Sequence, residues 1–268
     1  MVSNLITSGH PAGDHLDELT DDAVAGEFRL WQRRRGHRYS LDDVATAWEA
    51  ALALPEALHC LDLGCGVGSV LHMLAYRMPR AHFVGVEAEP VSFRLAERNV
   101  ARNNLSGRCR LIQGDLRTCV DPLALGRFDL VTGTPPYWPP GTATASPDRQ
   151  RAAARIELRG GIEVYLSAAA RVVSPAGRVV VCADARHPER VEQGARGVGL
   201  TPVRRRDVVP IVDRKRALFS VWTLGCALAG SGCERARTLV TRDSAGARTA
   251  DAQLLRSFFG LPPSAPCS

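Results

Sequence analysis

Three glycines at alternate positions are the first residues whose spacing could serve chemistry. Gly64, Gly66 and Gly68 follow the apolar run LHCLDL of residues 58–63. Glycine permits a tight turn and lets a ligand lie against the backbone. Asp62 stands two positions before the first glycine and adds a carboxylate beside the turn. The pattern predicts a buried strand, a glycine turn and the start of a helix that together hold a nucleoside cofactor.

The glycine spacing separates this stretch from the dinucleotide fingerprint. That fingerprint reads G-x-G-x-x-G and seats a pyrophosphate on a helix N-terminus, whereas the glycines here fall as G-x-G-x-G. The stretch resembles motif I of the class I S-adenosylmethionine (SAM) methyltransferases. The resemblance implies SAM as the cofactor, and the glycine spacing, together with the P-P-Y loop at residues 135–137, disfavours a nicotinamide-dependent oxidoreductase. The cofactor residues that it implies in this turn are Asp62, Gly64, Cys65, Gly66 and Gly68.

Two further acidic residues stand at the ends of the next two expected strands. Glu87 ends the run AHFVGVE, 19 positions after Gly68, where a carboxylate can accept both ribose hydroxyls. Asp115 follows the run CRLIQG and could accept a hydrogen bond from an adenine amino group, or alternatively cap a helix. With their following residues, Ala88 and Leu116, they complete the predicted cofactor site.

A proline loop follows the expected strand at residues 128–132 and carries the predicted methyl-transfer chemistry. Two consecutive prolines remove two N–H donors, so the loop presents mainly carbonyl acceptors that could orient an amine. Tyr137 offers a flat face for stacking on a base, and Trp138 could extend it. Because the methyl of SAM is already activated by its sulfonium, position matters most. The predicted catalytic residues are Thr134, Pro135, Pro136 and Tyr137.

The proline loop resembles motif IV, [N/D]-P-P-[Y/F], of the amino-methyltransferases that act on adenine N6, cytosine N4 or glutamine N5. From about residue 19 to 224, the chain resembles the bacterial tRNA1(Val) adenine-N6 methyltransferase family. The family's R-R-G-x-R-[FY] segment, with its following L-D, corresponds to residues 34–42, and its A-R-H-E element to 154–157. The resemblance implies a cofactor role for Asp42 and substrate-binding roles for Arg34, Arg35, Arg38, Trp138, Arg155 and Glu157.

Two departures from the family pattern leave the acceptor open. Thr134 stands where the family has asparagine, and Ile156 where it has histidine. Threonine is shorter, and its hydroxyl can donate as well as accept. The leading hypothesis is N-methylation of an amine on a planar acceptor, such as adenine N6 in tRNA. The alternatives are a small-molecule N- or O-methyltransferase, and a SAM- or RNA-binding module whose catalytic loop has decayed.

Composition adds an expectation about partners. The net charge is +6 and arginine dominates the basic residues, which favours an anionic partner such as tRNA or another RNA. An arginine- and alanine-rich composition is also what a GC-rich genome produces. Three basic clusters are candidate phosphate contacts: residues 33–35, 204–206 and 214–216.

The cysteines and the apolar runs suggest the compartment. The eight cysteines form no C-x-x-C pair and no Cys/His cluster, so we expect a reduced, cytoplasmic protein without a metal site. No run of about 18 apolar residues occurs, so we expect no membrane span.

The elements that must position these residues alternate between strand and helix. They predict an α/β, Rossmann-like class I methyltransferase fold, with a seven-stranded, mostly parallel sheet and an antiparallel final strand. We expect a flexible tail at 1–20, a methyltransferase domain at 21–226, and a flexible extension at 227–268 with one possible short helix. Within the domain, the basic segment 21–56 should hold an edge strand at 28–31, a basic hairpin tip around Gly36 and a helix.

Overall fold

The computed structural model describes residues 18–142, 144, 146–214, 216–226 and 232–262. Its main sheet runs in the order β8-β9-β7-β6-β3-β4-β5, and only β9 is antiparallel to its neighbours within this described set. This arrangement confirms the predicted mixed sheet. The strands are β3 (His59–Leu63), β4 (His82–Glu87), β5 (Cys109–Gln113), β6 (Phe128–Gly133), β7 (Val173–Asp184), β8 (Leu200–Val209) and β9 (Phe219–Cys226).

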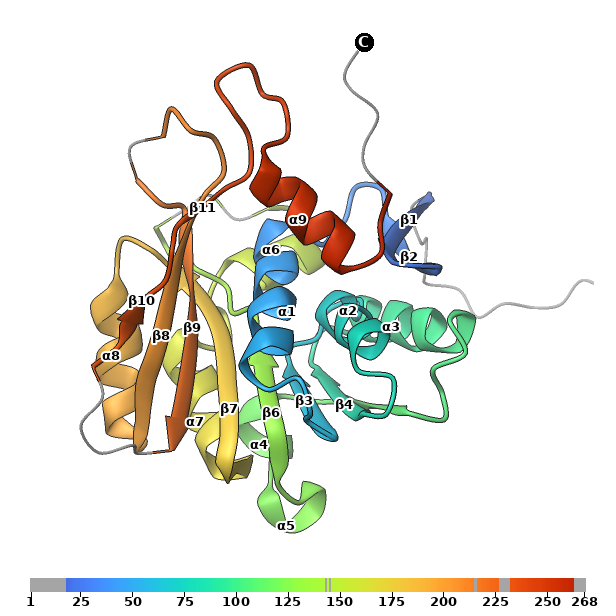
Figure 1. The fold of residues 1–268 in the computed structure, drawn as a ribbon. Coiled ribbons are helices and arrows are strands. Elements are labelled where there is room, and N and C mark those ends of the chain that lie inside the picture. The colour runs from blue at the N-terminus through green and yellow to red at the C-terminus, as the bar shows by residue number, and fades with distance from the viewer. Residues whose placement is uncertain (1–17, 143, 145, 215, 227–231, 263–268) are drawn as a thin grey trace, which may run out of the picture.

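Helices cover both faces of this sheet (Figure 1). Because side chains alternate along a strand, Val180 and Cys182 pack on the α1 side, while Val179 and Val181 pack on the α7 side. Burial on both faces explains why β7 reads as a continuous apolar run. On the first side lie α1 (Leu41–Ala53), α2 (Ser69–Arg77) and α3 (Pro90–Arg102); on the other lie α4 (Leu116–Cys119), α5 (Pro122–Leu125), α7 (Ile162–Val172) and α8 (Pro188–Gly197).

The N-terminal segment forms a separate antiparallel hairpin of β1 (Leu19–Ala25) and β2 (Phe28–Arg33). The expected edge strand is present, but β1 begins at Leu19, inside the range expected to be a tail. The hairpin turns at Gly26, whose φ is +49°, and not at Gly36. The expectation of a basic hairpin tip was therefore wrong, because the arginines lie at the end of β2 and in the turn between β2 and α1. Residues 1–17 of the expected tail lie outside the described residues.

The C-terminal segment corrects the expectation of a flexible extension. Two short strands, β10 (Glu234–Arg235) and β11 (Leu239–Val240), pair with β8, and α9 (Ala250–Phe258) follows. Leu255 and Phe259 are buried, and the backbone N–H of Gly26 donates to the carbonyl of Phe259 at 2.7 Å. Two buried apolar residues, Leu255 within α9 and Phe259 just after it, are enough to dock this segment. Residues 227–231 and 263–268 lie outside the described part.

One end of the sheet gathers the remaining elements. Figure 1 shows the β1-β2 hairpin, α6 (Arg149–Arg155) and α9 assembled at this end, where the proline loop leaves β6. Parallel strands present their carboxyl ends together, so this is where an open α/β sheet binds its ligands. Among the described helices, none has the length and apolar character needed to cross a bilayer.

Candidate active site

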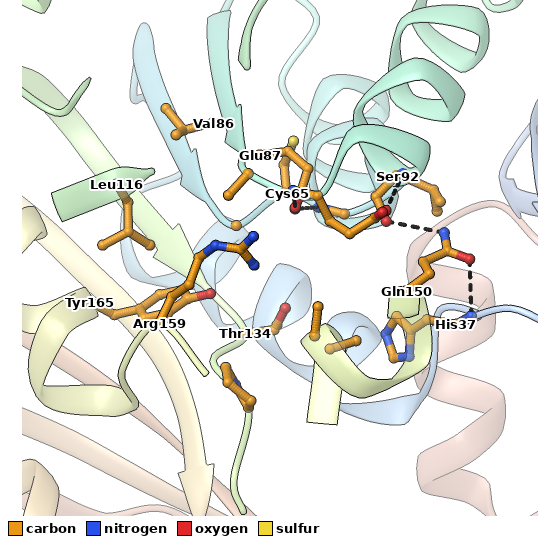
Figure 2. Close-up of a pocket in the computed structure, with 18 of the residues that line it drawn as sticks. His37, Cys65, Val86, Glu87, Ser92, Leu116, Thr134, Gln150, Arg159 and Tyr165 are labelled. Carbon is orange, nitrogen blue, oxygen red and sulfur yellow. Dashed lines mark hydrogen bonds between the residues drawn. The ribbon is translucent and has the colours of Figure 1, made fainter. Parts of the chain in front are cut away.

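A cavity opens at the carboxyl ends of β3, β4, β5 and β6 (Figure 2). It collects predicted residues from four separate strand ends, which the sequence alone could not show to be adjacent. The predicted residues that line it are Gly64, Cys65, Gly66, Glu87, Ala88, Asp115, Leu116, Thr134 and Pro136. Asp42, Asp62, Gly68, Pro135 and Tyr137 are not part of its lining.

Gly64 and Gly66 of the turn both have positive φ angles, a backbone conformation that favours glycine. Gly64 has φ of +64°, and a Cβ there would lie 2.3 Å from the hydroxyl of Tyr165. Gly66 has φ of +57°, but a Cβ there would meet nothing within 4 Å. The backbone at Gly66 therefore faces open space, as a turn that seats a ligand should.

The Glu87 side chain is held against this turn by two backbone hydrogen bonds. One carboxylate oxygen accepts the N–H of Gly66 at 2.8 Å, and the other accepts the N–H of Glu89 at 2.6 Å. Burial raises the pKa of this carboxyl above its ordinary value. Each carboxylate oxygen can accept a second hydrogen bond, so Glu87 keeps the capacity to bind two ribose hydroxyls.

Asp115 combines the two roles that the sequence offered as alternatives. It caps α4 by accepting the N–H of Arg117 at 3.0 Å, while its side chain also borders the cavity. The side-chain hydrogen bond from Arg117 lowers the pKa of Asp115. Arg159 lies 3.9 Å from the same carboxylate, and Figure 2 shows its guanidinium pointing into the cavity.

Two buried aspartates stand close to the glycine turn. Asp43 lines the cavity and accepts hydrogen bonds from the N–H of Ser40 at 2.8 Å and from the hydroxyl of Thr134 at 3.3 Å. Burial raises the pKa of Asp43 to about 8. Asp62 lies beneath the turn, where its Oδ1 accepts the hydroxyl of Thr132 at 2.8 Å and burial raises its pKa to about 7.

The structure places Asp43, rather than the predicted Asp42, at the cavity. Successive residues of a helix point about 100° apart, so only one of the pair can face the cofactor side. Asp42 turns away, and its Oδ2 lies 3.2 Å from the hydroxyl of Tyr137. A signal for Asp43 was present, because Ser40 and Asp43 have the S-x-x-[D/E] spacing with which a helix start is capped.

The proline loop divides its residues between two surfaces. Thr134 lines the main cavity, Pro135 and Tyr137 line a smaller neighbouring depression, and Pro136 lines both. The Tyr137 hydroxyl points inward and also lies 3.0 Å from the Sγ of Cys182. The proposed stacking face of Tyr137 is thus anchored beside the cavity rather than within it.

The A-R-I-E segment lies directly against the proline loop. The N–H of Trp138 donates to the carbonyl of Arg155 at 3.1 Å, and the N–H of Glu157 donates to the carbonyl of Trp138 at 2.9 Å. This pairing carries buried Ile156 to the cavity wall. The Glu157 carboxylate turns away from the cavity and pairs with Arg190 at 2.7 Å. Trp138 and Arg155 are exposed beside the cavity.

Several lining residues carried no motif that sequence reasoning could use. Gln150 donates to the Ser92 hydroxyl at 3.0 Å and accepts the N–H of His37 at 3.3 Å, which ties α6 to α3 and to the segment before α1 (Figure 2). These contacts join positions that are distant in sequence, so only the folded chain reveals them. The missed lining residues include His37, Asp43, Ser69, Ser92, Gln150, Arg159 and Tyr165.

The first arginine cluster, residues 33–35, spans the end of β2 and the turn after it, and Arg38 follows in the same segment. Arg34 pairs with Glu18 at 2.8 Å, and Arg38 pairs with Asp22 at 2.8 Å. Arg33 pairs with Asp148 at 2.8 Å, whereas Arg35 is exposed. None of these four residues borders the main cavity.

The cluster at 204–206 is mostly structural. Arg206 is buried and pairs with Glu49, and Arg205 is buried against Trp222 and pairs with Asp207 at 2.7 Å. The expectation that this cluster contacts phosphates was therefore wrong for these two residues, because their charges are satisfied inside the protein. In the third cluster, Arg214 and Arg216 are exposed, and residue 215 lies outside the described residues.

Comparisons with known proteins agree with this architecture. A family model described as "Methyltransferase domain" matches residues 54–202. The tRNA1(Val) (adenine(37)-N6)-methyltransferase of Porphyromonas gingivalis strain W83 is 35% identical over 168 residues, which is 60% of this chain and 64% of that protein. The release factor glutamine methyltransferase of Geobacter sulfurreducens is 34% identical over 140 residues, covering 50% of this chain and 48% of that protein. The chain thus aligns with less than two thirds of each relative's length.

Solved structures share the fold at low sequence identity. A predicted O-methyltransferase from Agrobacterium tumefaciens superposes with a TM-score of 0.63 at 16% identity, covering 83% of this chain and 98% of that chain. A precorrin-6y C5,15-methyltransferase from Geobacter metallireducens gives a TM-score of 0.51 at 14% identity, covering 74% and 93%. With the sheet order, the cavity and the match over residues 54–202, these findings show that the chain belongs to the methyltransferase-domain family, with the class I fold and SAM as its methyl donor.

Proposed function

We propose that this protein transfers the methyl group of SAM to the exocyclic N6 amine of an adenine in tRNA. The proposal rests on one observation, which is that Thr134 and Pro136 of the proline loop line the same cavity as the glycine turn and Glu87. The names of the P. gingivalis relatives and the net charge of +6 support RNA as the acceptor.

The residues of the cavity fit SAM. SAM supplies a methyl group on a positively charged sulfonium, and its amino group adds a second positive charge. Glu87 and Asp43 place acidic groups on the cavity wall, and Asp62 lies just beneath the turn. Glu87 would accept the ribose hydroxyls, Asp115 the adenine amino group, and the bare backbone at Gly66 would leave room for the methionine part.

Thr134 and Asp43 offer an acceptor in place of the family's asparagine. The Thr134 hydroxyl donates its hydrogen to Asp43. The lone pairs of the Thr134 oxygen therefore remain available to accept a hydrogen bond from an incoming amine. The amine nitrogen forms a bond to the methyl carbon, the carbon–sulfur bond breaks, and its electron pair stays on sulfur. The proton that the amine must then lose can pass through Thr134 to an ionised Asp43 or directly to water. The prolines of the loop hold this geometry without offering competing N–H donors.

The test is methyl transfer from labelled SAM into unmodified total tRNA and, in parallel, into a small-metabolite extract. We expect label in tRNA, released as N6-methyladenosine on digestion to nucleosides. We expect Thr134→Ala to lose turnover while still binding SAM, and Thr134→Asn, which restores the family residue, to stay active. Label in another nucleoside would refute the N6 assignment. Binding of SAM without transfer to any pool would favour the decayed-site alternative.

The second candidate acceptor is a small molecule. Thr134 favours it, because threonine lacks the amide oxygen with which the asparagine of the family motif accepts a hydrogen bond from the adenine amine. Label confined to the metabolite fraction would support it. Salt gives an independent criterion, since binding to a polyanion weakens steeply as salt rises. Activity that is insensitive to salt would therefore count against RNA.

A further inference from the structure

A second cavity, which we call the arginine groove, lies between the N-terminal and C-terminal segments. Its walls come from the hairpin and the start of α1 on one side, and from the β11–α9 region on the other. Tyr39 lines both this groove and the cofactor cavity, so the two adjoin. Four arginines line the groove: Arg38, Arg242, Arg248 and Arg256.

Three of these arginines have no carboxylate partner among the described residues. Arg38 is neutralised by Asp22 at 2.8 Å, but Arg242 donates to the carbonyl of Gly246 at 2.6 Å and Arg256 to the carbonyl of Pro262 at 2.8 Å. Arg248 is exposed to solvent. Carbonyl contacts orient a guanidinium without cancelling its charge. The groove therefore concentrates positive charge, in contrast to the paired arginines at 204–206.

The groove is formed almost entirely outside the matched family region. Apart from Met73, its lining residues lie before residue 54 or after residue 202. The docking of α9 fixes its shape, because buried Leu255 and Phe259 hold that helix against the domain. The C-terminal segment thus places three arginines in a groove that adjoins the main cavity at Tyr39.

We propose that the arginine groove binds the sugar-phosphate backbone of the RNA substrate, next to the nucleotide whose base enters the cavity. The proposal rests on the proposed function for its choice of RNA. Guanidinium groups bind phosphate oxygens through paired N–H donors, and such contacts position a nucleic acid without reading its sequence. Apolar residues also line the groove, among them Val44 and Leu261, and can contact the sugars of the bound strand.

The test compares two double variants with equal loss of charge. Arg242→Ala/Arg248→Ala removes two groove arginines, whereas Arg110→Ala/Arg127→Ala removes two exposed arginines that likewise have no carboxylate partner among the described residues, near the amino ends of β5 and β6 at the opposite end of the sheet. For the groove variant we expect KM for tRNA to rise on the order of tenfold, and the slope of log affinity against log salt to become shallower by about 1 to 2. The Kd for SAM should stay within about twofold, since no groove arginine lines the cofactor cavity. The control variant should keep the wild-type KM and salt slope.

Each alternative outcome would refute either the groove proposal alone or both the groove proposal and the proposed function. If wild-type protein methylates tRNA and the groove variant retains its KM and salt slope, the groove proposal fails and the proposed function stands. An equal loss in the control variant would also refute the groove, because bulk charge would explain it. If wild-type protein neither binds nor methylates tRNA, both proposals fail. Arg242→Lys/Arg248→Lys, which keeps the charge, should restore most tRNA binding, and thermal melts of all variants should show that each is folded.

Discussion

At the scale of single residues, Tyr137 anchors the proline loop, although the sequence predicted that its ring would stack on a base of the substrate. Tyr137 packs against the apolar core, and its hydroxyl reaches Asp42 and Cys182 in the interior. Stacking and anchoring require different parts of the Tyr137 side chain. The ring alone serves stacking, whereas the hydroxyl holds the loop in position.

Two substitutions at Tyr137 separate these roles. We expect Tyr137→Ala to lower turnover by roughly 10- to 100-fold, because base–aromatic stacking contributes about 1–3 kcal/mol, while SAM affinity stays unchanged. Tyr137→Phe keeps the ring and should cost about fivefold, as expected for one hydrogen bond. Single-turnover kinetics and SAM titrations would measure both effects. Unchanged turnover in Tyr137→Ala would rule out both roles, and equal losses in the two variants would assign the effect to the hydroxyl.

At the scale of elements, α9 ties the C-terminal segment to the rest of the molecule. Its buried face meets α1, where the rings of Trp48 and Phe258 approach edge to face at 6.5 Å. Docking of this helix also completes the arginine groove, so stability and substrate binding are linked through one element.

Two neighbouring leucines of α9 provide a matched test of this docking. Leu255 is 2% exposed, whereas Leu254 is 44% exposed. We expect Leu255→Ala to lower the free energy of unfolding by about 2–4 kcal/mol through the cavity it leaves, and Leu254→Ala to change it by less than about 0.5 kcal/mol. Urea unfolding of both variants would measure the difference. Equal effects of the two substitutions would show that α9 does not dock as described.

At the scale of the whole molecule, buried acids make stability depend on pH. The folded protein raises the pKa of Asp43 to about 8 through burial, well above its ordinary value. The folded state therefore keeps a proton that the unfolded state releases above pH of about 4. It follows that stability from this group is full at low pH, and is lost as pH rises toward the folded-state pKa.

Thermal melts of ligand-free protein between pH 6.8 and 8 would show this linkage. We expect the wild-type Tm to fall across this range, by about 2–4 °C for each kcal/mol lost. Asp43→Asn, which carries no titrating group, should show a smaller fall, so the difference isolates Asp43 from other groups. SAM is positively charged and favours the ionised carboxylate, so its binding should release protons and tighten as pH rises through this range. Parallel melting curves for the two proteins would contradict this assignment.

The sequence by itself determined the features that depend on local chemistry. Glycine at 64 and 66, the acidic end of β4 and the proline loop each follow from conformational rules that act within a few residues. The strand and helix alternation likewise fixed the fold class, since β7 and its neighbours carry the periodicity of a sheet covered on both faces. These signals identified nine of the residues that line the main cavity.

Only the tertiary structure decided which distant groups meet. The phase of α1 turned Asp43 rather than Asp42 to the cavity, and packing gave Arg206 a buried partner in Glu49, far away in sequence. The C-terminal segment looked unstructured because its apolar residues are few, yet Leu255 and Phe259 suffice once a complementary surface exists. The composition of a segment gives the number of its charged and apolar side chains. Folding determines which of these side chains are buried, which are paired, and which remain free to bind a partner.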